Sequence, residues 1–105
     1  MKYRPVFLRT ENQLNKLLKR QKKTGEQLTI LFISLWDDWC SELVGKINHS
    51  KEGHPLYIVD SFAMPHSFVI FNSFKLPHLV KLKKGNVSSE DYLPNIYKVL
   101  KVSSD

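Results

Sequence analysis

The sequence predicts an α/β domain in which helices flank a central mixed sheet of four to five strands. Leu28–Leu35 is a nearly continuous apolar run, which is typical of a central strand buried on both faces. Segments with helical periodicity lie on either side of this run, and an alternating strand with a Gly-containing turn follows later in the chain. The 105 residues, of which 42% are apolar, suit one domain, 1–105, with a real hydrophobic core.

The region before the central strand is expected to form a short strand and then a helix. Pro5–Leu8 can form the strand, with Pro5 at its start, where no backbone donor is needed. Thr10 and Gln13 have the spacing of a capping box, so a helix should begin after Thr10. Its apolar residues recur at i, i+3 and i+4, and Gly25 should end it.

A second helix should follow the central strand. Either Asp37 or Asp38 could cap a helix that starts near Trp39 or Cys40. Weak helix formers in its second half predict that it ends near His49. This helix is therefore expected to be short.

The second half of the chain alternates less regularly. Leu56–Val59 predicts a third strand, and Ser61–Leu76 could form either a short helix after Pro65 or an irregular packed loop. His78–Leu82 alternates as a strand with one buried face, and a Gly turn then leads to a fifth strand around Val87. Phenylalanines spaced three apart in the less certain stretch are expected in the core: Phe68, Phe71 and Phe74.

A final helix should close the domain. Asp91 is expected as its cap, with Pro94 in the first turn, where the missing N–H does no harm. The apolar face of this helix would carry Tyr92, Leu93, Ile96, Tyr97 and Leu100. The resulting order is β-α-β-α-β-α-β-β-α, which implies a mixed sheet with helices on both faces.

Two segments resemble a known family. The strand–helix junction reads WDDWC (Trp36–Cys40), and a later segment reads KLPHLVKLKKGNV (Lys75–Val87). Both resemble thioredoxins, which place a Trp-Cys-x-x-Cys motif after a strand and a cis-proline before a later hairpin. Trp39-Cys40 matches the Trp-Cys pair, Leu76-Pro77 the cis-proline loop and Gly85 the hairpin glycine. The resemblance implies a thioredoxin-like fold over nearly the whole chain.

The departures from thioredoxins bear on the chemistry. The second redox cysteine would fall at position 43, where this chain has Leu43, and Cys40 is its one cysteine. A dithiol enzyme releases its mixed disulfide with a second thiol, so the ordinary dithiol–disulfide mechanism is excluded. Ser34 also stands where the family usually has a buried aspartate.

Three roles remain for Cys40: a monothiol that exchanges with glutathione, an inert residue packed at the head of a helix, and a regulatory thiol. A helix N-terminus favours the thiolate. Asp37, Asp38 and Glu42 disfavour it, since nearby carboxylates oppose a second negative charge. Inert packing is the favoured role, so catalysis by Cys40 belongs only to the monothiol alternative, and the sequence favours a protein that is not an enzyme.

A peptide-binding groove is the favoured functional site. In thioredoxins the groove between the Trp-Cys turn and the cis-proline loop receives an extended polypeptide, which implies binding residues at Trp36, Trp39, Leu76, Pro77 and His78. Strand addition of this kind needs no redox chemistry. The alternatives are that both tryptophans are core or rim residues, and that His78 points away from the cysteine instead of forming a Cys–His pair. The favoured function is a redox-divergent, thioredoxin-like protein-binding or adaptor module.

A net charge of +6 indicates one further alternative function, which is binding to a negatively charged partner. The first helix should carry a basic face that could bind nucleic acid or an acidic protein: Lys16, Lys19, Arg20 and Lys23. The simpler interpretation is that this face is the solvated side of an amphipathic helix.

Neither a cofactor nor a metal site is predicted. The four histidines are too far apart in the sequence to place two ligands on one helix face. The N-terminus lacks the apolar stretch of a signal peptide, and the longest apolar run is too short to cross a bilayer. A cytoplasmic protein is therefore expected, and its oligomeric state stays open.

Overall fold

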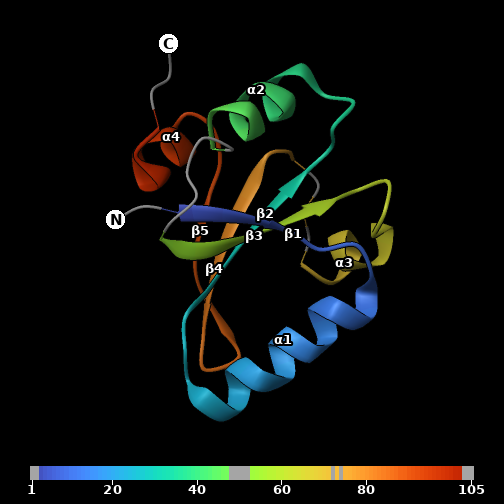
Figure 1. The fold of residues 1–105 in the computed structure, drawn as a ribbon, viewed down its shortest axis with the longest axis vertical. Helices are drawn as coiled ribbons and strands as arrows, with labels where there is room; N and C mark the ends of the chain where they lie inside the picture. The colour runs from blue at the N-terminus through green and yellow to red at the C-terminus, as the bar shows by residue number, and fades with distance from the viewer. Residues whose placement is uncertain (1–2, 48–52, 72, 74, 103–105) are drawn as a thin grey trace.

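The structure, a computed structural model, describes residues 3–47, 53–71, 73 and 75–102. Its elements follow the order that the sequence predicts (Figure 1). In chain order they are β1 (Tyr3–Phe7), α1 (Glu11–Thr24), β2 (Leu28–Ile33), α2 (Asp38–Ile47), β3 (His54–Asp60), α3 (Pro65–Ile70), β4 (His78–Lys83), β5 (Asn86–Asp91) and α4 (Asn95–Leu100). Within the described ranges, every helix is too short or too polar to span a bilayer.

The five strands form one mixed sheet in the order β1-β3-β2-β4-β5. β1, β3 and β2 are parallel, whereas β4 is antiparallel to both β2 and β5. β2 is central and every residue in it is buried, which confirms the expected central strand. It ends at Ile33 instead of Leu35. The Leu35 N–H donates to the side-chain carboxylate of Asp60 and not to a backbone carbonyl of a neighbouring strand.

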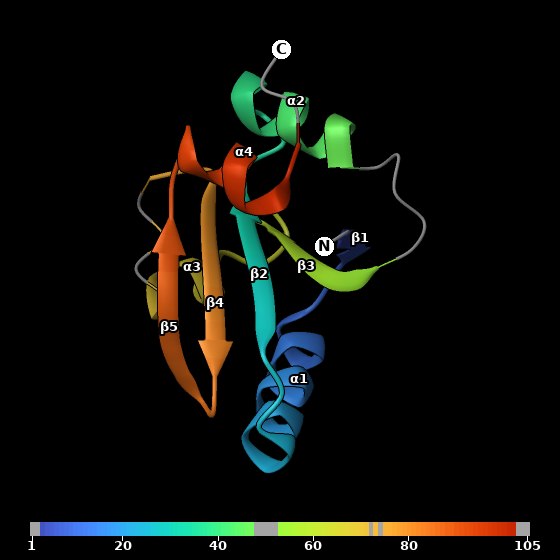
Figure 2. The ribbon, with the colours of Figure 1, turned by 90° about the vertical axis from the view of Figure 1, so that its left-hand side faces the viewer.

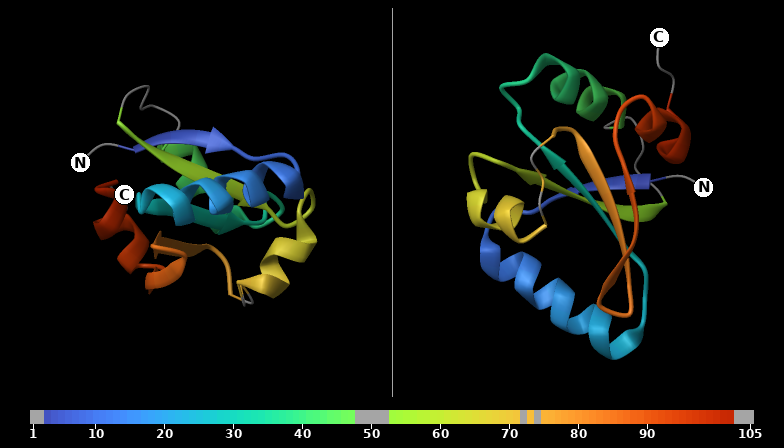
Figure 3. Two further views of the ribbon diagram at one scale, coloured as in Figure 1. Left: turned by 90° about the horizontal axis from the view of Figure 1, so that it is seen from below. Right: turned by 180° about the vertical axis from the view of Figure 1, so that it is seen from behind.

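Alternation along the strands separates two hydrophobic clusters, one on each face of the sheet. Leu31 and Ile33 pack in a cluster with residues of α2 and α4. Ile30 and Phe32 point the other way and pack with residues of α1 and α3. The helices accordingly lie on both sides of the sheet, as Figure 2 and Figure 3 show.

β1 begins two residues earlier than expected. It covers Tyr3–Phe7 instead of Pro5–Leu8, so Pro5 lies inside the strand. β1 is an edge strand paired only with β3, and an edge strand tolerates a residue whose missing N–H faces away from the partner. Leu8 has left the strand but still donates its N–H to the Ile58 carbonyl over 3.0 Å.

α1 has the predicted ends. The Thr10 hydroxyl accepts from the Gln13 N–H over 3.2 Å, and the Gln13 side chain accepts from the Thr10 N–H over 3.2 Å. At the other end, Gly25 has a φ of 74°, a left-handed conformation that suits glycine at a helix C-terminus. Both predicted helix signals are therefore confirmed.

We expect Thr10→Ala to lower the free energy of unfolding by about 1 kcal/mol, because the variant loses the side-chain cap of α1. Thr10→Ser keeps a hydroxyl acceptor and should lose much less. Urea denaturation of the three proteins measures both changes. Equal losses in the alanine and serine variants would show that the cap hydrogen bond does not contribute.

The last helix differs from the prediction. Asp91 does not cap it, because β5 continues through Asp91, which pairs with Leu79 of β4. α4 begins only at Asn95, and the preceding Pro94 makes no side-chain cap hydrogen bond.

The remaining elements follow the sequence with small shifts. α3 shows that the uncertain stretch after Pro65 is a short helix. β3 and β4 are slightly longer than expected. The expected end of the second helix at His49, and the expected core position of Phe74, lie outside the described residues.

Candidate functional site

The candidate site is the turn between β2 and α2, which is held in place by hydrogen bonds at both ends. The Leu35 N–H donates to Asp60 Oδ1 over 3.2 Å, which ties the turn to the end of β3. The Asp37 N–H donates to the Ser34 carbonyl over 2.9 Å, and the Ser41 hydroxyl donates to the Leu35 carbonyl over 2.9 Å. The turn is thus a fixed part of the sheet edge.

Asp37, and not Asp38, caps α2. Asp37 Oδ1 accepts from the Trp39 N–H over 2.9 Å and from the Cys40 N–H over 3.1 Å. These are the free donors that would otherwise favour a thiolate at a helix N-terminus. Because a carboxylate already occupies them, the helix end gives the Cys40 sulfur little help.

Cys40 is a fully buried thiol. Burial, the largest cause, raises the pKa of Cys40, and a backbone hydrogen bond from Ser34 opposes that rise. The carboxylates of Asp37 and Asp60 raise the pKa further, since each opposes a second negative charge nearby. At neutral pH the site therefore holds a protonated thiol.

Leu43 lies at the position where the resemblance to thioredoxins places the second redox cysteine. Its side chain is fully buried and belongs to the same hydrophobic cluster as Cys40. Both residues lie on the inner face of α2, where they pack over the sheet. Position 43 is therefore a core position in this protein.

The outer side of the turn exposes large apolar side chains. Trp36 is 85% exposed and Trp39 is 63% exposed, so neither tryptophan is a core residue. Leu35 is also exposed, and Phe62, in the loop after β3, is 80% exposed. The Ser61 N–H donates to the Ile33 carbonyl over 2.9 Å, which keeps that loop beside the end of β2. We call Leu35, Trp36, Trp39 and Phe62 the aromatic rim.

The Leu76–Pro77 segment lies at the same end of the sheet as this turn, where β2 ends and β4 begins. Phe32, next to the end of β2, pairs with His78 at the start of β4, so the residues before β4 lie beside the turn that follows β2. Leu76 is half-buried and packs against the cluster that contains Cys40. The peptide bond between Leu76 and Pro77 is cis.

Solved structures share this fold. Thioredoxin NaTrxh from Nicotiana alata superposes with a TM-score of 0.78 at 16% identity, over 96% of this chain and 94% of its own. Schistosoma mansoni thioredoxin superposes with a TM-score of 0.74 at 15% identity, over 93% of this chain and 94% of its own. Thioredoxin O2 from Arabidopsis thaliana gives 0.73 at 18% identity, over 92% of this chain and 91% of its own. The chain has the thioredoxin-like fold. Neither a protein-family model nor a curated protein sequence matches it.

In this thioredoxin-like fold His78 does not approach Cys40. Its side chain is fully buried and packs near Phe32, on the face of the sheet that α1 and α3 cover, whereas Cys40 packs on the face of α2. Ser73 Oγ lies 2.8 Å from His78 Nδ1, and Glu90 Oε1 lies 3.0 Å from His78 Nε2. The His78 side chain is thus engaged inside the protein.

Some residues that contact the buried His78 side chain were not found by sequence reasoning. The Tyr92 ring stacks on His78 with centroids 4.7 Å apart and an interplanar angle of 4°. Ser73, Glu90 and His78 lie on three segments whose spacing follows no motif, so only the fold brings them together. Phe62 could have been anticipated, because it follows a parallel strand at the edge where the turn lies.

The basic face is on α1, away from the aromatic rim. The four residues assigned to it are all exposed: Lys16, Lys19, Arg20 and Lys23. Figure 1 shows α1 at one end of the molecule and α2 at the other. The β4–β5 hairpin reaches α1, where the Gly85 N–H donates to Gln21 Oε1 over 2.9 Å. Across the described ranges, no three His, Cys, Asp or Glu residues are grouped to hold a metal ion.

Proposed function

We propose that the protein binds extended polypeptide segments at the aromatic rim and the Leu76–Pro77 segment, as an adaptor without dithiol–disulfide chemistry. The observation that carries this proposal is the contrast between Cys40, which is fully buried, and Trp36, which is 85% exposed. The aromatic rim exposes large apolar side chains to a partner, whereas the Cys40 thiol is buried beneath it and is not accessible to a partner. Exposed tryptophans are common anchors in protein interfaces.

The backbone beside the rim supports strand addition. The bend at 75–77 precedes β4, so its peptide groups are not used by the sheet ladder. An extended peptide could pair with the backbone of Leu76 while its side chains contact Trp36 and Trp39. Since the His78 side chain is buried, His78 contributes to this proposal only through its position in the chain.

Charge around the rim favours a basic peptide. Asp38 and Glu42 are exposed on the first turns of α2, where Glu42 pairs with Lys46 over 3.5 Å, and Asp37 lies at the cap of the helix. Carboxylates at the border of an apolar surface attract Lys and Arg side chains of a partner. The favoured partner is therefore an extended segment with apolar residues flanked by Lys or Arg.

Selection of peptides from a random phage-displayed library, followed by tryptophan fluorescence titration, tests this function. We expect Trp36→Ala and Trp39→Ala each to weaken binding of the selected peptides by about tenfold or more. Cys40→Ser should leave the affinity unchanged, with or without reductant. Val87→Ala, an exposed residue on β5, is the matched control.

Two results would overturn the adaptor proposal. One is peptide binding that disappears in Cys40→Ser or in the presence of reductant, because it would indicate mixed-disulfide capture. The other is binding that Trp36→Ala and Trp39→Ala leave unchanged, because the contact surface would then lie elsewhere.

The monothiol alternative requires an accessible thiolate at Cys40. The burial of Cys40 and the causes that raise its pKa count against that alternative. A deglutathionylation assay that compares the protein with Cys40→Ser decides between the two functions. Activity above that of Cys40→Ser would favour the monothiol enzyme.

The basic face remains a second alternative. Its residues are exposed on α1, as are Lys83 and Lys84 of the β4–β5 hairpin that contacts α1. Binding of nucleic acid to this surface must weaken as salt rises, because counterions are released. Titration of a single-stranded oligonucleotide at two salt concentrations distinguishes this alternative from the aromatic rim.

A further inference from the structure

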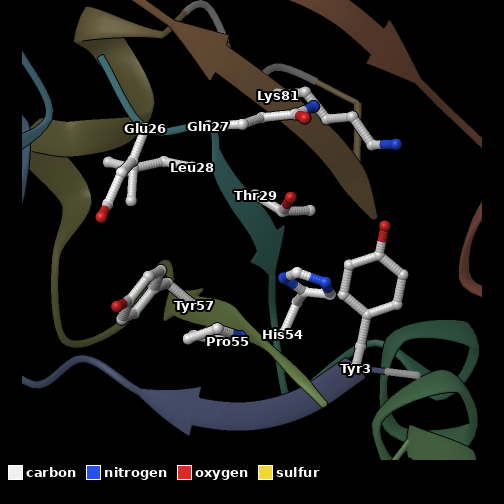
Figure 4. A pocket seen from close by; sticks show the side chains of 9 residues that line it. All are labelled: Tyr3, Glu26, Gln27, Leu28, Thr29, His54, Pro55, Tyr57 and Lys81. Carbon is white, nitrogen blue, oxygen red and sulfur yellow. The ribbon is translucent and has the colours of Figure 1, made fainter. Parts of the chain in front are cut away.

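A cavity of about 480 Å³ lies at the end of the sheet away from the aromatic rim. It is formed near the beginnings of β1, β2 and β3 and beside the later half of β4. Figure 4 shows side chains from all four strands around it. This cavity shares no residue with the rim, so an inference about it is independent of the proposed function.

Four polar side chains reach the cavity from one face of the sheet: Tyr3, Thr29, His54 and Lys81. Strand register explains why they meet, because Tyr3 pairs with His54 and Thr29 pairs with Lys81. Thr29 and Lys81 continue the same alternation as Leu31 and Leu79, which α2 and α4 cover farther along the sheet. The cavity thus includes the part of this face that these helices leave open. It continues around the ends of β2 and β3 to Leu28, Pro55 and Tyr57, of which Leu28 and Tyr57 belong to the cluster on the opposite face.

Two of these side chains have unused hydroxyl groups. Tyr3 and Thr29 are each only 7% exposed. Among the residues that the structure describes, neither hydroxyl has a hydrogen-bond partner. Neither hydroxyl oxygen is among the fully buried polar atoms that lack a partner, so both are accessible at the cavity and are free to hydrogen-bond to a ligand there.

The charge on this side of the cavity is positive. Lys81 is half-buried and forms no ion pair in the described part of the chain. Figure 4 shows Tyr3, His54 and Thr29 on the Lys81 side, whereas Glu26 lies at the other end of the cavity with Leu28 and Tyr57. The acidic and the donor-rich parts of the wall are therefore separate.

We propose that this cavity binds a small phosphate monoester. Lys81 supplies a positive charge, and Tyr3, Thr29 and His54 supply further hydrogen-bond donors. Four donors from four strands suit the several oxygen acceptors of a phosphate better than the two of a planar carboxylate. A cavity of about 480 Å³ exceeds the size of a phosphate group, and the apolar walls at Leu28, Pro55 and Tyr57 can contact the organic part.

Phenyl phosphate is the probe that tests the site. Titration at pH 7, followed by backbone amide shifts in NMR, should show saturable binding with a dissociation constant below about 1 mM. The shifts should be centred on residues 27–29, 54–57 and 81. Phenol, which lacks the phosphate, should bind at least about tenfold more weakly, since it loses the charge-assisted hydrogen bonds.

Conservative variants separate the site from general electrostatic attraction. Lys81→Met should weaken binding of phenyl phosphate by about tenfold or more, and Tyr3→Phe and Thr29→Val by about threefold or more. Lys16→Met removes the same charge from α1, outside the cavity, and should have almost no effect. Thermal melting of each variant establishes that it is folded.

Several outcomes would overturn the proposal. They are the absence of saturable binding, equal weakening by Lys16→Met and Lys81→Met, and shifts centred on α1 instead of the strand ends. Binding that Tyr3→Phe and Thr29→Val leave unchanged would also overturn it, because the unused hydroxyls would then have no part in recognition.

Discussion

Replacing Phe32 with alanine should lower the free energy of unfolding by about 3–5 kcal/mol. Phe32 is fully buried on β2, at the centre of the sheet. Its ring lies 5.2 Å from that of Phe68 and 5.3 Å from that of Phe71, both contributed by the α3 region. The substitution removes these contacts and leaves a cavity that rigid neighbouring strands cannot close.

A loss of this size is large for a domain of 105 residues. Native domains are stable by only about 5–15 kcal/mol, so Phe32→Ala should be partly unfolded at 37 °C. Urea denaturation at 25 °C measures the change. Val87→Ala, on the exposed side of β5, should cost less than about 0.5 kcal/mol. A cost below about 1 kcal/mol for Phe32→Ala would contradict the packing described for this cluster.

The fold was largely predictable because its local signals agree with its tertiary contacts. The apolar run at Leu28 is typical of a strand buried on both faces, and it forms the centre of the sheet. The Thr10 capping box and Gly25 set the ends of α1 by local hydrogen bonds and backbone conformation alone. Such features depend little on distant parts of the chain.

Errors arose where tertiary pairing overrides a local signal. Asp91 has the side chain of a helix cap, but pairing with Leu79 keeps it in β5. Pro5 is a usual first residue of a strand, but an edge position allows it to lie inside β1. Neither outcome can be read from the neighbouring residues.

The candidate site was predictable only in part. Trp36 and Trp39 were identified from the sequence, but their exposure depends on how α2 packs over the sheet. The contacts of His78 with Ser73 and Glu90 join segments that no spacing rule connects. The cavity beside Lys81 also escaped sequence reasoning, because strand register alone brings its four polar side chains together.

The Cys40 thiol should react with iodoacetamide at least about a hundredfold more slowly in the folded protein than in urea. The thiolate is the nucleophile, and both the burial of Cys40 and the raised pKa keep its thiolate population low. A matched control carries Cys40→Ser with Glu42→Cys, which moves the thiol to an exposed position two residues along α2. The control thiol should react almost as fast as an unfolded one.

The pH dependence follows from the same environment. Because the pKa of Cys40 is raised above its usual value of 9.0, the folded protein keeps the thiol proton at a pH where the unfolded chain loses it. The stability contributed by Cys40 is therefore fully present below pH 9.0 and falls as the pH rises above that value. Urea denaturation at pH 8 and pH 10 should show a larger loss for the native sequence than for Cys40→Ser. If alkylation instead levelled off near neutral pH, Cys40 would hold an accessible thiolate and the monothiol function would replace the adaptor proposal.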